Sequence, residues 1–221
     1  MHKIRRIGVE STIQTLRDWT KQHEKPTLRS TVKERNPFKT MIACLISLRT
    51  QDSNTKKASE NLFRVADTPK GISELPLEEI EKRIYSCGYY RMKAKTIKHV
   101  AGVILKKYGG KVPSSTDELL SIKGIGRKTA TITRVFGFRK ADCIPVDVHV
   151  HVIANRFGWV KSKSPEDTEI QLMKIIPKEY WFEINTLLVL FGQKICQTNS
   201  PLCSECPLKK NCLRINVERS R

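Results

Sequence analysis

Apolar residues recur along this chain every three to four positions, and strict alternation of apolar and polar residues is scarce. The first spacing is typical of helices that bury one face, and the second would indicate strands. The residues that share one helical face are, in one segment, Phe38, Ile42, Leu45 and Ile46 and, in another, Leu77, Ile80 and Ile84. Turn residues separate the segments without a long or low-complexity linker. The pattern therefore predicts an all-α protein of short helices.

The stretch "SIKGIGRKTA" predicts two helices joined by a tight turn. Ser115 and Glu118 have the spacing of a capping box, so a helix should begin near Thr116. Gly124 and Gly126 permit a tight turn before a second, basic helix. Phosphate oxygens can approach the backbone N–H groups at the start of that helix, where the dipole favours an anion. An ordinary helix-turn-helix corner has the same glycine spacing, and this alternative stays open on the residues alone.

Charge points to a polyanionic partner. The 221 residues include 41 lysines and arginines against 22 acidic residues, a net charge of +19 that is spread along the chain. Neutralising phosphates releases counterions, so nucleic acid is the favoured partner, with a solvated surface or an acidic protein as the alternative. No apolar run has the length of a membrane span or the form of a secretory signal, so we expect a soluble intracellular protein without membrane contact.

Four of the seven cysteines are crowded near the end of the sequence. Cys196, Cys203, Cys206 and Cys212 have the spacing C-x6-C-x2-C-x5-C, close enough for four thiolates to surround one metal centre. The spacing leaves the metal open, although zinc sites usually offer two C-x2-C pairs and only one is present. The remaining three, Cys44, Cys87 and Cys143, lie in or beside apolar patterns and are expected to be small core residues.

Three motifs in fixed order carry a family resemblance. "LLSIKGIGRKTA", "VDVHVHVIANRFGW" and "CQTNSPLCSECPLKKNC" together resemble the endonuclease III branch of the helix-hairpin-helix DNA glycosylases, over roughly residues 36–212. The resemblance implies a two-domain, all-α helix-hairpin-helix DNA glycosylase fold. A six-helix barrel domain would span residues 33–140, with the hairpin at about 116–137. Residues 1–32 and 141–221 would form a discontinuous domain around a [4Fe–4S] cluster on the four cysteines, with a structural role.

Two residues become catalytic candidates. In this family a lysine at the position of Lys128 implies a covalent glycosylase with lyase activity. The positive end of the helix dipole and the neighbouring Arg127 both disfavour a charged amine there, which would help a neutral amine to attack C1′ of the sugar. Without the resemblance, a phosphate-binding or solvated lysine is the ordinary interpretation. Asp147 is placed by its pattern as a helix N-cap, and the resemblance adds stabilisation of the cationic sugar.

The resemblance also implies which residues contact DNA. The hairpin turn would do so through Gly124, Ile125, Gly126 and Arg127. Arg49, in the segment 47–55, and Tyr89, in the segment 88–94, occupy the positions that enter the duplex when a damaged nucleotide is extruded. Surface residues of a basic protein are the alternative for both.

Some residues depart from the expected patterns. The loop between the first two cluster cysteines, "QTNSPL", contains no lysine or arginine, so its contribution to DNA affinity is in doubt. Val148 follows Asp147 where many relatives carry threonine. His149 and His151 are spaced to point to different faces of a helix, so we do not expect them to form a metal pair.

The sequence thus predicts a base-excision-repair enzyme that removes oxidised pyrimidines from duplex DNA and cleaves the abasic strand by β-elimination. A glycosylase for thymine or uracil opposite guanine is the enzymatic alternative, and an architectural DNA-binding protein is the non-enzymatic one. We expect a monomer, located in the cytoplasm of a prokaryote and associated with the nucleoid.

Overall fold

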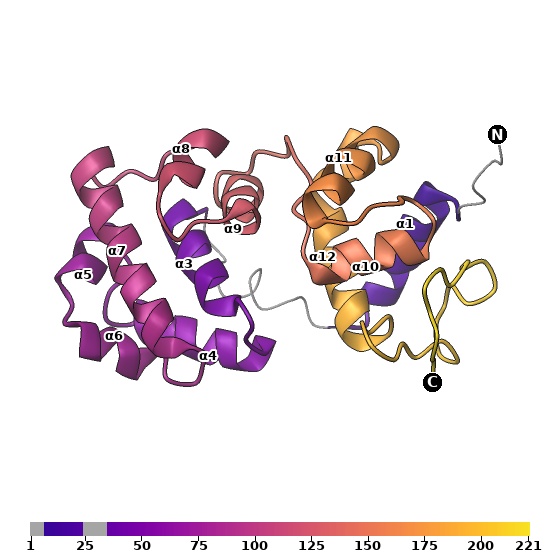
Figure 1. Ribbon diagram of the computed structural model, residues 1–221, viewed down its shortest axis with the longest axis horizontal. Coiled ribbons are helices and arrows are strands. Elements are labelled where there is room, and N and C mark those ends of the chain that lie inside the picture. Colours follow the sequence, from indigo (N-terminus) through magenta and orange to yellow (C-terminus); the bar gives the residue numbers. More distant parts are fainter. Residues whose placement is uncertain (1–6, 24–34) are drawn as a thin grey trace. The chain divides into compact units, whose positions relative to one another are not determined.

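Every regular element in the described part of the chain is a helix. The structure is a computed structural model that describes residues 7–23 and 35–221 (Figure 1). The elements are α1 (Val9–Thr20), α3 (Pro37–Ser47), α4 (Asp52–Phe63), α5 (Pro69–Glu74), α6 (Leu77–Arg83), α7 (Tyr90–Tyr108), α8 (Thr116–Ser121), α9 (Arg127–Ile132), the π-helical segment η1 (Thr133–Gly137), α10 (Val148–Arg156), α11 (Pro165–Ile175), the 3₁₀ turn η2 (Lys178–Tyr180) and α12 (Trp181–Lys194). The predicted all-α class is confirmed.

The described residues fall into two compact units. Residues 35–140 form one unit, and residues 7–23 and 141–221 together form the other. The domain boundary expected between residues 32 and 33 lies outside the described residues. Within the described ranges, no helix is long and apolar enough to span a membrane.

Helix α3 is the centre of the unit 35–140. Asn36 caps it by accepting a hydrogen bond from the Lys39 backbone N–H at 2.9 Å, and Pro37 opens its first turn. Residue 38 and residues 40–46 are all buried, so the helix is covered on every face. Helices α4, α7 and α9 and the segment η1 pack around it. At Gly137 a side-chain Cβ would lie 2.7 Å from the Pro37 Cα, so glycine permits the closest of these approaches.

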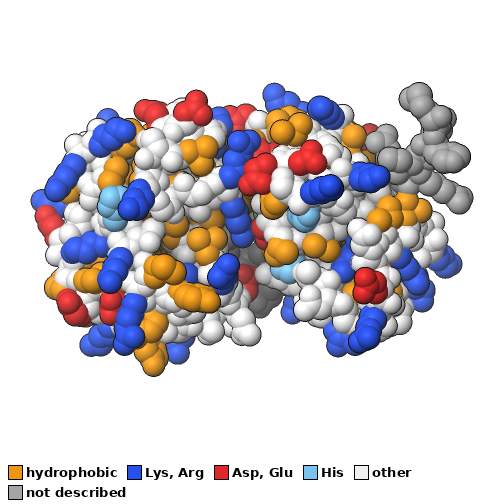
Figure 2. Space-filling model, in the orientation of Figure 1, with side chains coloured by type: hydrophobic (Ala, Val, Ile, Leu, Met, Phe, Trp, Pro, Cys, Tyr) orange, Lys and Arg blue, Asp and Glu red, His pale blue; other side chains and the backbone are white. Residues whose placement is uncertain are grey.

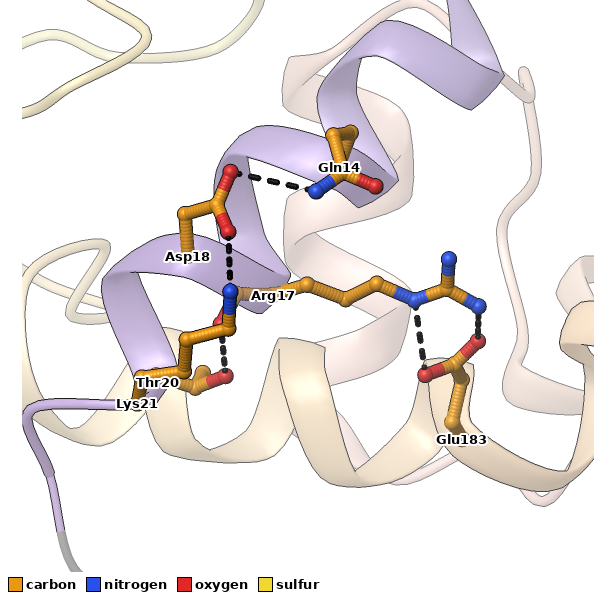
Figure 3. A network of polar contacts seen from close by, with 6 residues as sticks. All are labelled: Gln14, Arg17, Asp18, Thr20, Lys21 and Glu183. Atoms are coloured by element: carbon orange, nitrogen blue, oxygen red, sulfur yellow. Dashed lines mark hydrogen bonds and ion pairs between the residues drawn. The ribbon is translucent and has the colours of Figure 1, made fainter.

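In the other unit, the N-terminal helix α1 packs on α12. Ile13 and Leu16 are fully buried there. Figure 3 shows Arg17 reaching from α1 to Glu183 on α12, where the guanidinium donates two hydrogen bonds to the carboxylate, one of them from Nε to Oε2 at 3.1 Å. The Trp159 indole N–H also donates to the Ile7 carbonyl at 3.0 Å. These contacts explain why segments far apart in sequence share one core.

Candidate functional site

The predicted hairpin is formed by α8, a glycine turn and α9. Ser115 Oγ accepts a hydrogen bond from the Glu118 backbone N–H at 3.3 Å and donates one to the Glu118 carboxylate at 2.6 Å. This confirms the predicted cap and fixes the start of α8 at Thr116. The second helix of the hairpin, α9, ends at Ile132 and continues as the π-helical segment η1 to Gly137.

The two glycines of the turn have different reasons to be glycine. Gly124 has φ +99°, and a Cβ there would lie 2.6 Å from the Thr96 Cγ2, so the fold requires glycine. Gly126 has φ −92°, which any residue adopts, and a Cβ there would meet no atom within 4 Å. The fold therefore does not require Gly126, and its missing side chain leaves open space before α9. Ile125 between them is 5% exposed in the core, so this position can offer a ligand only its backbone.

Lys128 lies in the first turn of α9, half-buried between exposed Arg127 and buried Thr129. The helix is anchored directly behind it, because the Cys44 thiol of α3 donates a hydrogen bond to Thr129 Oγ1 at 3.6 Å. Packing against α3 therefore fixes the backbone from which the Lys128 side chain extends.

Asp147 is the N-cap of α10. Its Oδ1 accepts a hydrogen bond from the Val150 backbone N–H at 3.0 Å, which confirms the predicted cap. Lys128 and Asp147 belong to different units of the chain.

His151 Nδ1 lies 2.6 Å from Thr168 Oγ1 on α11, whereas His149 packs against Gly192 on α12. The two histidines therefore face different helices, as their spacing predicts.

Two turns bring Arg49 and Tyr89 together. We call residues 48–51, after α3, the Arg49 loop, and residues 84–89, before α7, the Tyr89 loop. The Arg49 guanidinium carbon lies 5.9 Å from the centre of the Tyr89 ring, within cation–π range. Both residues adopt the left-handed conformation, with φ 51° and 58° respectively. Non-glycine residues rarely adopt it unless surrounding contacts impose it.

The two loops also expose apolar side chains on a strongly basic protein. Tyr89 is 60% exposed, and large exposed apolar side chains around it in the loops and the first turn of α7 are Leu48, Tyr85 and Met92. Lysine and arginine side chains are spread over the face of both units seen in Figure 2, with fewer acidic ones among them. Exposed rings and apolar tips within a positive surface suit stacked bases flanked by phosphates.

The four clustered cysteines line a single pocket, together with Arg156 and Phe157. Cys196 is buried and the other three are half-buried. Among the residues that the structure describes, no three His, Cys, Asp or Glu side chains converge tightly enough to hold one metal ion. The other three cysteines, Cys44, Cys87 and Cys143, are buried elsewhere, as predicted for core residues.

The pocket disfavours bare thiolates. Burial, with a smaller contribution from the neighbouring cysteines, raises the pKa of the Cys206 thiol to about 11. Burial likewise raises the pKa of Cys196, where the Arg156 guanidinium opposes the shift, and the pKa of Cys212. Four soft sulfur donors line this one pocket, and three of them, Cys196, Cys206 and Cys212, are costly to ionise unaided. Such a donor set fits a cationic metal centre that stabilises the sulfurs as thiolates.

Comparison with known proteins identifies the family of this chain. Residues 42–178 match the model of the HhH-GPD superfamily of base excision DNA repair proteins. The chain is 46% identical over 180 residues to endonuclease III of Thermotoga maritima, covering 81% of this chain and 84% of that protein. This chain belongs to the endonuclease III family. As a member of that family it is a base-excision-repair DNA glycosylase.

Two solved structures of endonuclease III extend the agreement to the fold. A non-covalent endonuclease III–DNA complex matches with a TM-score of 0.79 at 35% identity, over 93% of this chain and 96% of that chain. A trapped covalent endonuclease III–DNA intermediate matches with a TM-score of 0.78 at 34% identity, over the same shares. The fold expected from the three motifs is confirmed.

In this endonuclease III relative, Arg156 organises the loop that follows Cys196, the first of the four pocket cysteines. The side chain is 5% exposed, and its Nη1 donates to the carbonyls of Cys196 at 3.2 Å and Gln197 at 2.8 Å. Nη1 also lies 3.4 Å from Cys196 Sγ, and Nη2 donates to the Thr198 carbonyl at 2.6 Å. The uncharged loop 197–202 is therefore held from inside by a cation.

Sequence reasoning missed Arg156 and Lys93, the second of which is described below. Both lie on the buried face of an amphipathic helix, and the other residues of that face are apolar. Arg156 follows Ile153 by three residues, and Lys93 precedes Ile97 by four. A charged residue at a position where the helical period demands an apolar one is the signal that identifies them.

We expect Arg156→Leu to loosen the loop 197–202. Loss of the guanidinium leaves three carbonyls without their donor, which should lower the free energy of unfolding by about 2–4 kcal/mol. Hydrogen exchange of the amides in 197–202 should accelerate, while the matched variant Arg219→Leu, which removes an exposed arginine, should change neither quantity. Unchanged exchange in Arg156→Leu would show that the loop is held by other contacts.

Proposed function

We propose that this protein is a bifunctional DNA glycosylase and abasic-site lyase that removes oxidised pyrimidines from duplex DNA. The observation that carries the proposal is Lys128, which stands in the first turn of the hairpin helix of an endonuclease III family member. A relative of the same fold has been trapped as a covalent intermediate with DNA, which supports covalent chemistry. The open space at Gly126 supports an approach of the DNA backbone to the start of α9.

Lys128 acts as the nucleophile. Its neutral amine attacks C1′ of the damaged nucleotide, the new C–N bond forms, and the bond from C1′ to the base breaks. Opening of the sugar leaves a Schiff base between the lysine and C1′. Loss of a proton from C2′ then expels the 3′ phosphate and cleaves the strand, and water releases the lysine. Anchoring of α9 on α3 keeps the position of the amine fixed through these steps.

Asp147 stabilises the positive charge that develops on the sugar as the base departs. One of its carboxylate oxygens holds the first turn of α10, so the charge is held in a fixed orientation. A preorganised charge of this kind lowers the barrier without reorganisation during the reaction. The capping and catalytic roles use the same rigid placement.

The four cysteines hold a [4Fe–4S] cluster, which supplies structural cohesion when bound. Residues 197–221 contain no helix, so this segment depends on the cysteines and on Arg156 for its conformation. Metal binding in such a segment contributes directly to folding. The duplex is bound by the hairpin turn and by the Arg49 and Tyr89 loops, whose exposed apolar tips suit the space left by an extruded base.

Borohydride reduction during turnover should trap a covalent adduct through Lys128. Lys128→Ala should trap no adduct, whereas Lys123→Ala, which removes a neighbouring exposed lysine, should trap as the wild type does. The yield of adduct is measured on denaturing gels with a duplex that carries one oxidised pyrimidine. Peptide mapping then identifies the modified residue. An equal yield of adduct from Lys128→Ala would rule out this nucleophile.

Asp147→Asn should lose base excision while its DNA affinity and stability stay near those of the wild type. The amide oxygen can still accept the Val150 N–H, so the substitution removes the charge and keeps the cap. We expect the single-turnover excision rate to fall about 100-fold or more. Weak binding with an unchanged excision rate would leave Asp147 with the cap as its only role.

The protein purified without oxygen should contain about four iron and four sulfide per chain. Cys203→Ala should lose the metal and reduce the yield of folded protein, because the site supports folding. Cys143→Ala removes a buried thiol outside the pocket and should retain the iron. Iron and sulfide analysis together with the yield of folded protein tests this, and stoichiometric zinc in native protein would contradict it.

A further inference from the structure

Lys93 is a buried lysine whose ammonium reaches the Arg49 loop from α7. The residue is 8% exposed, and Nζ donates to the Ile46 carbonyl at 2.7 Å and to Thr50 Oγ1 at 2.6 Å. The Ile46 carbonyl belongs to the last turn of α3, where the helix dipole favours a cation. Thr50 Oγ1 in turn donates to the Leu48 carbonyl at 3.3 Å. The ammonium therefore fixes both ends of the turn that carries Arg49.

Further contacts join the same turn to the Tyr89 loop. Burial raises the pKa of the Cys87 thiol, and Lys93 and the Thr50 side chain lie near enough to oppose that shift. A Cβ on Gly88 would lie 3.1 Å from the Arg49 carbonyl oxygen, so the two backbones run close together. The Lys93 backbone N–H donates to the Tyr89 carbonyl at 3.0 Å. The Lys93 side chain is thus bonded to the Arg49 loop, and its backbone N–H makes the first hydrogen bond of α7, to the carbonyl of the N-cap residue Tyr89.

Folding alone does not account for the ammonium. Burial lowers the pKa of Lys93, with Cys87 opposing the shift, so the charge is held at a cost. Lys93 lies among the apolar residues of the buried face of α7, where methionine would fill similar space without desolvating a charge. A costly buried cation is explained if its hydrogen bonds impose a conformation that an apolar side chain could not impose.

The conformation in question is the pair of left-handed residues at the loop tips. Arg49 and Tyr89 both have positive φ, and their side chains meet at 5.9 Å. The left-handed conformation is unfavourable for a non-glycine residue, and it persists where surrounding contacts hold the backbone in place. The hydrogen bond from Lys93 to Thr50 supplies such a contact to the Arg49 loop. The proximity of Thr50 and Lys93 to Cys87 supplies one to the Tyr89 loop.

We propose that Lys93 is a positioning residue that holds the Arg49 and Tyr89 loops in the conformation with which they enter the duplex. The inference rests on the proposed function, in which these loops fill the space of an extruded base. Preorganised loops lower the barrier to extrusion, because no reorganisation has to accompany their entry. Lys93 therefore acts on the step that opens the base pair and leaves the chemistry at C1′ unchanged.

Lys93→Met tests the proposal, with Lys95→Met as the control that removes an exposed lysine from the same helix. Single-turnover excision of a stably paired lesion should fall roughly tenfold to a hundredfold in Lys93→Met. Cleavage of a preformed abasic site, which has no base to extrude, should stay within about threefold of the wild type. Lys95→Met should match the wild type in both reactions. Equal losses on the two substrates, or no loss on either, would overturn the inference.

Thr50 provides a second test that leaves the buried lysine in place. Thr50→Val removes the acceptor of the Lys93 ammonium at nearly constant shape, and should slow excision of the paired lesion selectively. Thr50→Ser keeps the hydroxyl and should restore most of the lost rate. Equal rates for the valine and serine variants would contradict the positioning role.

Hydrogen exchange of the amides in 47–51 and 86–90 separates this inference from the proposed function. The measurement uses the free protein and needs no activity, and Lys93→Met should exchange faster in both segments than Lys95→Met. A wild-type protein that excises no base and forms no covalent adduct with DNA would overturn the proposed function. Hydrogen exchange would still show whether Lys93 holds the two loops. Unchanged exchange in Lys93→Met would overturn the positioning role.

Discussion

Burial of α3 on every face is the constraint on which the unit 35–140 depends. A helix that is apolar all round must be covered from all sides, so its neighbours have little freedom in where they pack. Helices α4, α7 and α9 with η1 provide that cover. The groups to which we assign functions in this unit extend from α3 and its cover: the Arg49 loop from the end of α3 itself, Lys128 from the start of α9, and the Tyr89 loop from the start of α7. Rigid packing behind each group gives these three surface features a fixed relation to one core.

The unit formed by residues 7–23 and 141–221 is ordered in a different way. Residues 197–221 contain no helix, and they contribute one buried leucine, Leu208, to the core. Order comes also from polar contacts to α10, chiefly those of Arg156, and in our proposal from the cluster held by the four cysteines. The N-terminal helix α1 adds to the same core through Leu16 and the Arg17–Glu183 pair. Closing the unit with the first helix of the chain explains why its sequence is discontinuous.

Local patterns sufficed for much of this structure. The Ser115 and Asp147 caps, the turn at Gly124 and the divergent histidines follow from interactions within a few residues, which sequence spacing records directly. Contacts between residues far apart in the sequence are not recorded in the spacing of neighbouring residues. Whether Lys93 points to solvent or into the core depends on acceptors more than 40 residues away, on Ile46 and Thr50. A basic residue in a chain of net charge +19 is assigned by default to the surface, and that default concealed both Lys93 and Arg156.

The informative residues are those that the fold does not require. Gly124 is dictated by its φ and by Thr96, so its presence says little about function, whereas Gly126 has an ordinary φ and open space where a side chain would fit. Lys93 likewise occupies a place where an apolar residue would satisfy the packing at lower cost. Sequences are locally consistent with their fold except where another requirement prevails. Here the exceptions fall at the entrance to the hairpin helix and behind the two loops, the places to which we assign binding of the duplex and opening of a base pair. The same reasoning separates the observed cap of Asp147 from its proposed catalytic role, since an asparagine would serve the cap equally well and the proposed reaction gives a reason for the charge.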